Sequence, residues 1–413
     1  MNLKTCLPKW LGLLAALAVP SAGAMTQEIR AVFTPDPANP QRNAFVNVTP
    51  VSGRCVNNPG DCRAENMSSI RLPIKFQSAR AMQPNDPVVR NRAMFKIPAQ
   101  WRSLTVTNAD TGKSETVEVR VAGIASQYRL SDTAQNLTGE SNLQLAHARL
   151  WDGRWDNAPS PCTYSTGAGL GADYYYFVWR TPVEGTCVRY AQFPIPGVSY
   201  EYLDFIYQLR TPNPLGMSSG LYTGSLNYSF GPGGDYDMGD VMLPDDPVLT
   251  LDFVLDVQHA LKVDIPPGGE KIQLVPEGGW QNWLQAGRKP VRVFRDQTFN
   301  ISASTRFKMR LECEFIYVAH CMLRDSVSNR TVQVFTRISL PNGLTWSGGQ
   351  PIQRHLLRSD FGVPPTVYPG FYVDRAPGVL HFEIPGFYFK PMLGPGEGGR
   401  FRGNVTVIWD SEV

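Results

Sequence analysis

Charged residues are scarce in this chain of 413 residues, and long apolar segments and metal-ligand patterns are absent from the sequence after residue 24. These features argue against three classes: nucleic-acid-binding, membrane-inserted and metal-binding proteins. Charged side chains make up 18% of the sequence and the formal net charge is +3, so we do not expect a nucleic acid as partner. After residue 24, no segment approaches the roughly 20 apolar residues of a membrane helix, so we expect no membrane insertion. No C-x-x-C occurs and the 5 histidines lack ligand spacing, so we expect no metal and no other cofactor.

Turn-forming and apolar residues are abundant instead. The chain has 37 Gly and 34 Pro beside 42% hydrophobic residues, which predicts an ordered protein of many short strands. Alternation of apolar and polar residues from Leu249 to Ile265 predicts one long strand, or two joined at a bulge, with His259 as a hydrogen-bonded core residue. A similar pattern from Leu104 to Val121, broken at Asn108–Gly112, predicts a β-hairpin.

Residues 1–24 have the composition of an export signal. Lys4 and Lys9 precede the apolar stretch Leu11–Val19, and the small residues Ala22-Gly23-Ala24 resemble a cleavage site. We therefore expect a mature chain that begins at Met25 and is exported.

The cysteines support an exported protein. Of the 7 cysteines, Cys6 lies in the signal, and an even set remains. Six cysteines formally allow fifteen pairings, and we expect sequence neighbours to pair rather than to bind a metal. The expected disulfides are Cys55–Cys62, Cys162–Cys187 and Cys313–Cys321.

The chain is expected to form two all-β domains. The segments Gly220–Leu226 and Gly399–Val405 share the pattern G-x-aromatic-x-G-x-aliphatic, which suggests the same kind of strand in each half. Pro and acidic residues break the strand pattern at Leu243–Pro247. We expect β-sandwich domains at 25–244 and 245–413.

Candidate ligand-binding residues lie in the first half. The segment Trp151–Asn157 combines aromatic rings, which could stack on sugars, with the polar side chains of Asp152, Arg154 and Asp156; the alternative is that Trp151 and Trp155 are core residues beside a turn. Arg90 and Arg92 belong to a run of basic residues that is either a patch for an anionic receptor or a charged strand edge. Ser218 fits G-x-S-x-G, but an alternating strand follows where a hydrolase needs a helix, so we assign no catalytic residue.

Four segments of the second half carry a resemblance to a known family: a strand, an aromatic motif, a stretch with its cysteine pair, and the ending. These are Leu251–Ile265, Gly278–Trp283, Phe299–Cys313 with Cys321–Leu323, and Gly403–Asp410. In these segments the chain resembles the two-domain tip adhesins of chaperone-usher fimbriae, with the CupB type as the nearest subtype.

The resemblance implies an amino-terminal receptor-binding β-sandwich and a carboxy-terminal pilin domain of incomplete immunoglobulin-like fold that lacks its last strand. Another chain fills the resulting groove by strand addition. A periplasmic chaperone would supply the strand first, the next fimbrial subunit would replace it after passage through the outer-membrane usher, and the adhesin would reach the cell surface at the fimbrial tip. The candidate contacts with the donated strand are Val405, Val407, Trp409 and Val413.

The expected function is therefore attachment to a surface glycan or glycoprotein receptor without catalysis. Two alternatives remain: an exported β-sandwich hydrolase acting on glycans, and a structural subunit that binds no receptor. A tip adhesin should lack a free donor segment at its amino terminus, and we expect Glu28–Phe33 to be the first strand of the first domain.

Overall fold

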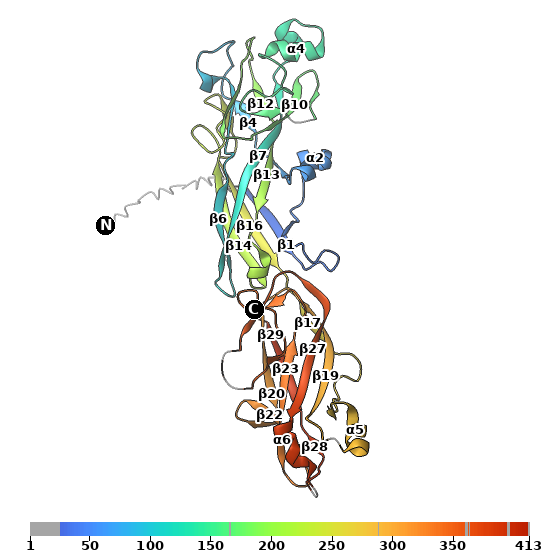
Figure 1. Cartoon of the computed structure of the whole chain (residues 1–413). Helices are drawn as coiled ribbons and strands as arrows, with labels where there is room; N and C mark the ends of the chain where they lie inside the picture. Colours follow the sequence, from blue (N-terminus) through green and yellow to red (C-terminus); the bar gives the residue numbers. More distant parts are fainter. Residues whose placement is uncertain are drawn as a thin grey trace, which may run out of the picture.

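The computed structural model describes residues 25–164, 167–287, 289–359, 362, 364–394 and 397–411. These residues form two β-rich units arranged end to end (Figure 1), as the expected all-β class requires. The candidate contact Val413 lies outside the described residues. Among the described helices, none is long and apolar enough to cross a membrane.

The first unit is built on a 14-stranded sheet. Its main path runs in the order β15 (Met242–Pro244), β4 (Phe76–Ser78), β12 (Val198–Tyr200), β7 (Ser114–Leu130), β6 (Arg102–Asn108), β14 (Gly220–Ser229), β16 (Val248–Val257), β1 (Met25–Phe33) and β2 (Val46–Asn47). The other members are β3 (Ser68–Leu72), β8 (Thr163–Tyr164), β9 (Gly169–Leu170), β10 (Tyr174–Arg180) and β13 (Leu203–Arg210). A separate ladder joins β5 (Ala93–Ile97) to β11 (Gly185–Arg189).

The 17-residue strand β7 organises this unit because it pairs with β6, β13, β10 and β12 along its length. The expected hairpin is confirmed as β6 and β7. Asn108 closes its turn, since its Oδ1 accepts the N–H groups of Asp110 and Thr111, and Gly112 supplies a left-handed φ of 67°.

The short helices of the first unit lie in the connections between strands. They are α1 (Arg54–Asn57), α2 (Pro59–Ala64), α3 (Ala134–Thr138) and α4 (Leu143–Leu150), with the 3-10 turns η1 (Val89–Asn91) and η2 (Pro214–Gly216).

The second unit has two facing sheets. The larger runs β17 (Leu261–Asp264), β19 (Arg292–Ala303), β27 (Val373–Pro385), β23 (Thr331–Ser339), β22 (His320–Asp325) and β21 (Phe315–Tyr317), and it also holds β18 (Val275–Pro276), β25 (His355–Leu356) and β28 (Phe401–Arg402). The smaller runs β24 (Leu344–Thr345), β26 (Thr366–Pro369), β20 (Phe307–Cys313) and β29 (Val405–Ser411). Helices α5 (Gly279–Ala286), α6 (Gly386–Phe389) and η3 (Lys390–Leu393) complete the unit. Phe299 and Ile301 from one sheet pack with Phe307 and Met309 from the other in one buried cluster.

Strand pairing moves the division between the units from the expected position. Strand β16 pairs with β14 and β1 throughout its length, so Val248–Val257 belongs to the first sheet rather than to the second unit. Although the alternation in sequence runs from Leu249 to Ile265, β16 ends at Val257 and β17 starts the second unit at Leu261. The segment is therefore neither one strand nor two strands joined at a bulge, because β16 and β17 belong to different sheets. The break at Leu243–Pro247 is a connection within the first unit.

The seven-residue repeat does not mark equivalent strands. Its first copy lies within the single strand β14, where Gly224 is needed because a Cβ would come within 2.2 Å of the Thr105 carbonyl oxygen. Its second copy spans β28 and the start of β29, which belong to different sheets. The expectation of one recurring strand was therefore wrong.

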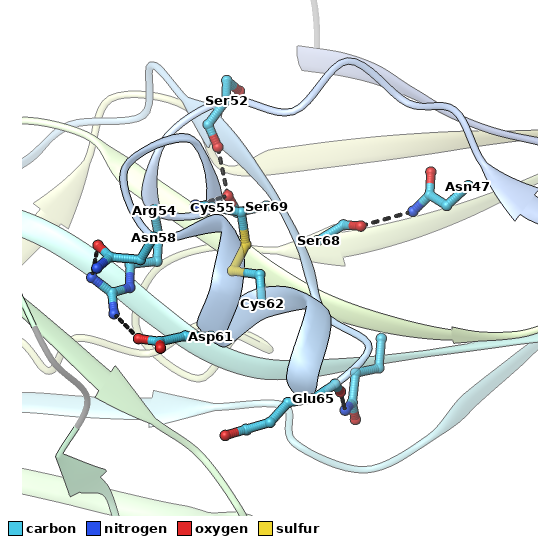
Figure 2. The surroundings of a disulfide bond; sticks show 11 residues. Asn47, Ser52, Arg54, Cys55, Asn58, Asp61, Cys62, Glu65, Ser68 and Ser69 are labelled. Atoms are coloured by element: carbon cyan, nitrogen blue, oxygen red, sulfur yellow. Dashed lines mark hydrogen bonds and ion pairs between the residues drawn. A yellow bond between two sulfur atoms is a disulfide. The ribbon is translucent and has the colours of Figure 1, made fainter.

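All three expected disulfides are present, as Cys55–Cys62, Cys162–Cys187 and Cys313–Cys321. The first joins α1 to α2, and Figure 2 shows Arg54 beside it, turned toward Asn58 and Asp61. The guanidinium of Arg54 is buried and pairs with Asp61 Oδ2 at 3.1 Å. The disulfide and this ion pair both join α1 to α2, and the Ser69 hydroxyl of β3 attaches the connection to the sheet by accepting the Cys55 N–H at 2.8 Å.

Candidate functional site

The last described strand, β29, lies at an open sheet edge. It pairs antiparallel with β20 from Val405 opposite Cys313 to Ser411 opposite Phe307. Among the described residues, β20 is its only strand partner. The backbone groups on the other side of β29 are therefore available to a strand from another chain.

The apolar face of β29 is incompletely covered. Val405, Val407 and Trp409 pack against the core of the second unit but remain partly exposed. The inward residues of β20, by contrast, are buried: Phe307 is 0% exposed, and Met309 and Leu311 are 4% exposed. β20 lies between β29, which pairs with it from Phe307 to Cys313, and β26, which pairs with it at Phe307 and Lys308, whereas β29 has one strand neighbour among the described residues.

Trp409 anchors the open strand. Its ring centroid lies 5.3 Å from that of Phe299 and 5.7 Å from that of Phe307. These contacts fix the orientation of β29, so its edge presents an ordered backbone and a row of apolar side chains. That combination suits strand addition, in which the backbone supplies affinity and alternate side chains enter the apolar surface.

The amino-terminal strand is not a spare donor. Strand β1 pairs in parallel with β16 from Met25 opposite Leu249 to Phe33 opposite Val257, and antiparallel with β2. Ile29, Ala31 and Phe33 are buried in the core of the first unit. The expectation that Glu28–Phe33 is the first strand of the first unit is confirmed.

The two tryptophans expected to stack on a sugar are core residues. Trp151 is 1% exposed and Trp155 is 0% exposed. Trp155 stacks on Trp179 with ring centroids 5.1 Å apart, and its carbonyl oxygen accepts the indole N–H of Trp179 at 2.7 Å. Neither ring face reaches solvent, so the alternative of core tryptophans beside a turn is the observed one.

The polar side chains of the same segment do reach the surface. Arg154 and Asp152 are exposed, and Arg154 forms an ion pair with Asp156. The Asp152 carboxylate accepts the Tyr190 N–H at 3.1 Å and an N–H of the buried Arg189 at 3.3 Å. The turn therefore fixes the position of these polar groups.

Arg90 and Arg92 lie in different surroundings. Arg90 donates to Asp237 Oδ2 at 2.8 Å and to Asp240 Oδ1 at 2.8 Å, and these pairs raise the pKa of Arg90 further. Arg92 instead lies over the Tyr190 ring, with Cζ 4.0 Å from the ring centroid. Arg90 thus joins η1 to the loop that precedes β15, whereas Arg92 contacts Tyr190, whose N–H donates to Asp152.

Tyr190 is the residue that sequence reasoning missed. Its backbone pairs with Asp152 and its ring lies under Arg92, so it brings together two candidates that are 60 positions apart in the chain. No local pattern marks it, since it follows β11 without a distinctive motif. We define the polar loop surface as Arg92, Asp152, Arg154 and Tyr190.

One serine, histidine and aspartate of the described residues do converge, on the neighbouring strands β23, β27 and β19 of the second unit. The Ser339 hydroxyl lies 2.9 Å from His381 Nε2, and His381 Nδ1 lies 2.8 Å from Asp296 Oδ1. The same hydroxyl accepts the Arg354 backbone N–H at 2.9 Å.

No group of three His, Cys, Asp or Glu side chains among the described residues could hold a metal ion. Ser218 is 0% exposed, and Lys113 Nζ donates to its Oγ at 2.8 Å. The strand β14 begins at Gly220, so the context of a hydrolase nucleophile is missing around this serine.

No family model and no curated protein matches the chain. Its structural neighbours include CfaE, the adhesive subunit of the CFA/I fimbria of enterotoxigenic Escherichia coli, at 9% identity over 94% of this chain and 93% of that one, with a TM-score of 0.26. A chaperone–tip adhesin complex of CFA/I fimbriae matches at 9% identity over 94% and 97%, with a TM-score of 0.25. The CsuC–CsuE chaperone–tip subunit complex of the archaic Csu pili of Acinetobacter baumannii matches at 11% identity over 94% and 98%, with a TM-score of 0.21. At such identities, the residues of those adhesins do not transfer to this chain one by one.

Proposed function

We propose that this chain is the tip adhesin of a chaperone-usher fimbria, with a receptor-binding first unit and a pilin-type second unit completed by a strand from another chain. The observation that carries the proposal is β29, an edge strand whose apolar face is partly exposed beside the buried face of β20. The sequence resemblance to these adhesins, with the CupB type as the nearest subtype, points the same way.

The order of partners follows from the open edge. An exposed apolar edge strand is an aggregation hazard in transit, so a periplasmic chaperone covers it first. The usher then passes the chain outward, and the next subunit replaces the chaperone strand on β29. The mature protein is thus exported through the periplasm to the cell surface.

A terminal position in the fimbria follows from the other end of the chain. An internal subunit needs a free amino-terminal segment to complete its neighbour. Here β1 is paired with β16 and β2 and buries Ile29, Ala31 and Phe33, so it has no apolar face to donate. In this proposal the chain accepts a strand on β29, and β1 stays in its own sheet.

The polar loop surface is our candidate for the receptor site. Arg92, Asp152 and Arg154 offer charged and hydrogen-bonding groups to the hydroxyl and carboxylate groups of a surface glycan or glycoprotein, and Tyr190 supports Arg92 from below. Arg90 is excluded from this role because it pairs with two carboxylates, one of them that of the buried Asp237, whereas Arg154 is more exposed and pairs with the single carboxylate of Asp156.

Strand complementation tests the proposal directly. Residues 25–413 are exported alone, or with a flexible linker and an alternating donor strand of about nine residues fused after Val413. The matched control carries the same donor shifted by one residue, which turns its apolar face to solvent. We expect soluble, trypsin-resistant monomer only with the in-register donor. A stable monomer without any donor would refute the incomplete second unit.

Receptor binding is tested on the complemented chain. Wild type, R92A and D152N are compared on a glycan array, and both variants should bind less than wild type. R210A, which removes an exposed arginine on β13 away from this surface, is the control and should bind like wild type. Binding without consumption of the glycan distinguishes an adhesin from an exported hydrolase, and no binding to any glycan or glycoprotein would favour a purely structural subunit.

A further inference from the structure

The start of strand β1 faces a carboxylate. The Met25 backbone nitrogen donates to Asp246 Oδ2 at 3.2 Å. The other oxygen of the same carboxylate, Oδ1, accepts the Val248 N–H at 3.0 Å, which fixes the side chain in a turn immediately before β16. Asp246 is thus held in place by its own segment and turned toward the first residue of the expected mature chain.

This end of β1 has few other attachments. Met25 is partly buried against the core, Thr26 to Glu28 are not buried, and complete burial begins at Ile29. On one side β16 pairs with the whole strand in parallel, whereas β2 reaches only Ala31 and Val32 on the other side. Fraying of β1 therefore begins at Met25, where the Asp246 contact lies.

We propose that removal of residues 1–24 converts the Met25 nitrogen into an α-ammonium group whose built counter-ion is Asp246, so that processing fastens β1 to β16. Hydrolysis of the Ala24–Met25 peptide bond adds the OH of water to the Ala24 carbonyl carbon and its hydrogen to the Met25 nitrogen. The released amine then takes a proton from solvent.

The chemistry of the contact changes at that step. Before cleavage, the amide nitrogen has one neutral N–H to donate. After cleavage it carries three N–H groups and a positive charge at neutral pH, because an α-amino group has an ordinary pKa of about 7.7–8.0. Charge-assisted hydrogen bonds to a carboxylate are stronger than neutral ones. The contact between the Met25 nitrogen and Asp246 is therefore stronger in the processed chain than in the precursor, with the same geometry.

The acidic pair at Asp245–Asp246 then has two separate tasks. Asp245 Oδ1 accepts the Lys75 N–H at 2.9 Å, and its own N–H donates to the Lys75 carbonyl oxygen at 3.0 Å, which joins the segment to the neighbourhood of β4. Asp246 serves β1. This assignment does not depend on the adhesin function, since it concerns only export and the first unit.

The test uses the exported chain with the in-register donor strand fused after Val413, and two ways of removing the ion pair. Mass spectrometry of the purified protein should give a first residue of Met25. Hydrogen exchange of the Thr26–Glu28 amides is then compared between wild type, D246N and wild type acetylated at its α-amine. Asn keeps the oxygen that accepts the Val248 N–H, and acetylation keeps one N–H, so each change removes one charge. D245N is the matched control.

We expect D246N and acetylation each to raise the exchange rate of these amides about two- to fivefold, as the loss of a surface ion pair predicts. In the acetylated chain the ion pair is already lost, so D246N should raise the exchange rate little further. D245N should leave the Thr26–Glu28 amides unchanged. A mature terminus at another residue would overturn the proposal. So would unchanged exchange after acetylation, or an equal effect of D246N on acetylated and unacetylated chains.

Discussion

The imidazole Nε2 of His259 donates a hydrogen bond to the carbonyl oxygen of Met217 at 3.0 Å. Because a carbonyl only accepts, Nε2 carries the hydrogen, and Nδ1 accepts from the Ser304 hydroxyl at 3.2 Å. Met217 belongs to the first unit and Ser304 to the second, so one ring ties the two together. A second tie is the Tyr372 N–H, which donates to the Pro40 carbonyl oxygen at 3.2 Å.

Acidification should weaken the His259 joint. Burial lowers the pKa of His259, with a smaller contribution from the nearby Arg306, so the folded chain prefers the neutral ring. A group whose pKa is lowered on folding contributes its stability above its unfolded pKa, about 6.5 for His, and that stability is lost as the pH falls below this value. Calorimetry of the donor-complemented chain from pH 7.5 to 5 should therefore show falling stability.

The variant H259Q isolates this residue, because an amide can donate to Met217 and accept from Ser304 without titrating. His147 also has a lowered pKa through burial, but it is present in both proteins. The difference between wild type and H259Q should thus change with pH in the direction described. Parallel pH curves would exclude His259 as the titrating group.

Removing Arg71 should destabilise the first unit. Its guanidinium donates to both carboxylate oxygens of Asp204, at 2.7 and 3.1 Å, and Asp204 is 0% exposed. Burial raises the pKa of Asp204, and the Arg71 pair offsets part of that rise. Because Arg71 itself is partly exposed, we expect R71A to cost about 2–3 kcal/mol in urea unfolding rather than the full cost of a buried pair. R210A, which breaks the exposed pair with Glu118, is the control and should cost less than about 1 kcal/mol.

A buried tyrosine and histidine form a second sensitive pair. His147 Nε2 lies 2.7 Å from the Gly171 carbonyl oxygen, so it donates there, and Nδ1 accepts from the Tyr128 hydroxyl at 2.6 Å. Y128F leaves Nδ1 without its donor in a buried site, so we expect a loss of about 1–3 kcal/mol. Far-UV circular dichroism during urea unfolding measures the loss, and Y164F, at an exposed position, should change little. An unchanged midpoint in Y128F would mean that this hydrogen bond does not contribute.

Substitution of Arg90 should lower the stability of the chain, whereas substitution of Arg92 should lower receptor binding. Burial tends to raise the pKa of Asp237, but the Arg90 pair and the N–H groups of Gly233 and Gly239 outweigh it and keep the pKa low. R90A should therefore lower the unfolding free energy by about 1–3 kcal/mol near pH 7, with the difference shrinking below about pH 4 as Asp237 is protonated. R92A should leave stability within about 0.5 kcal/mol and reduce receptor binding. The reverse pattern in thermal melts and binding assays would reject both assignments.

Local patterns predicted the features that depend on neighbouring residues. The β6–β7 hairpin, the three disulfides and the strand character of Leu249–Val257 were all predictable, since alternation, turn residues and close cysteines lie within short segments. The joint at His259 was not, because the apolar alternation continues past it. Only the partners Met217 and Ser304, which are distant in sequence, reveal that the chain changes units there.

The binding surface was less predictable for the same reason. Trp155 looks available beside Asp152 and Asp156, and its burial depends on Trp179, Phe177 and Tyr128 from β10 and β7. The basic run around Arg90 is opposed in the local sequence only by Asp86. In the folded chain Asp235, Asp237 and Asp240 neutralise two of its members, Arg102 and Arg90, from more than 130 positions away.

Hydrogen exchange along β29 tests the central claim most directly. Exchange is measured on whatever soluble fraction is recovered of three exported chains: one without a donor strand, one with the in-register donor, and one with the donor shifted by one residue. The account predicts that the Val405–Ser411 amides not bonded to β20 exchange at least about tenfold more slowly with the in-register donor, because several backbone hydrogen bonds form at once. Equal protection of these amides in all three proteins would mean that β29 is not an acceptor edge, and the fimbrial account would fail with it.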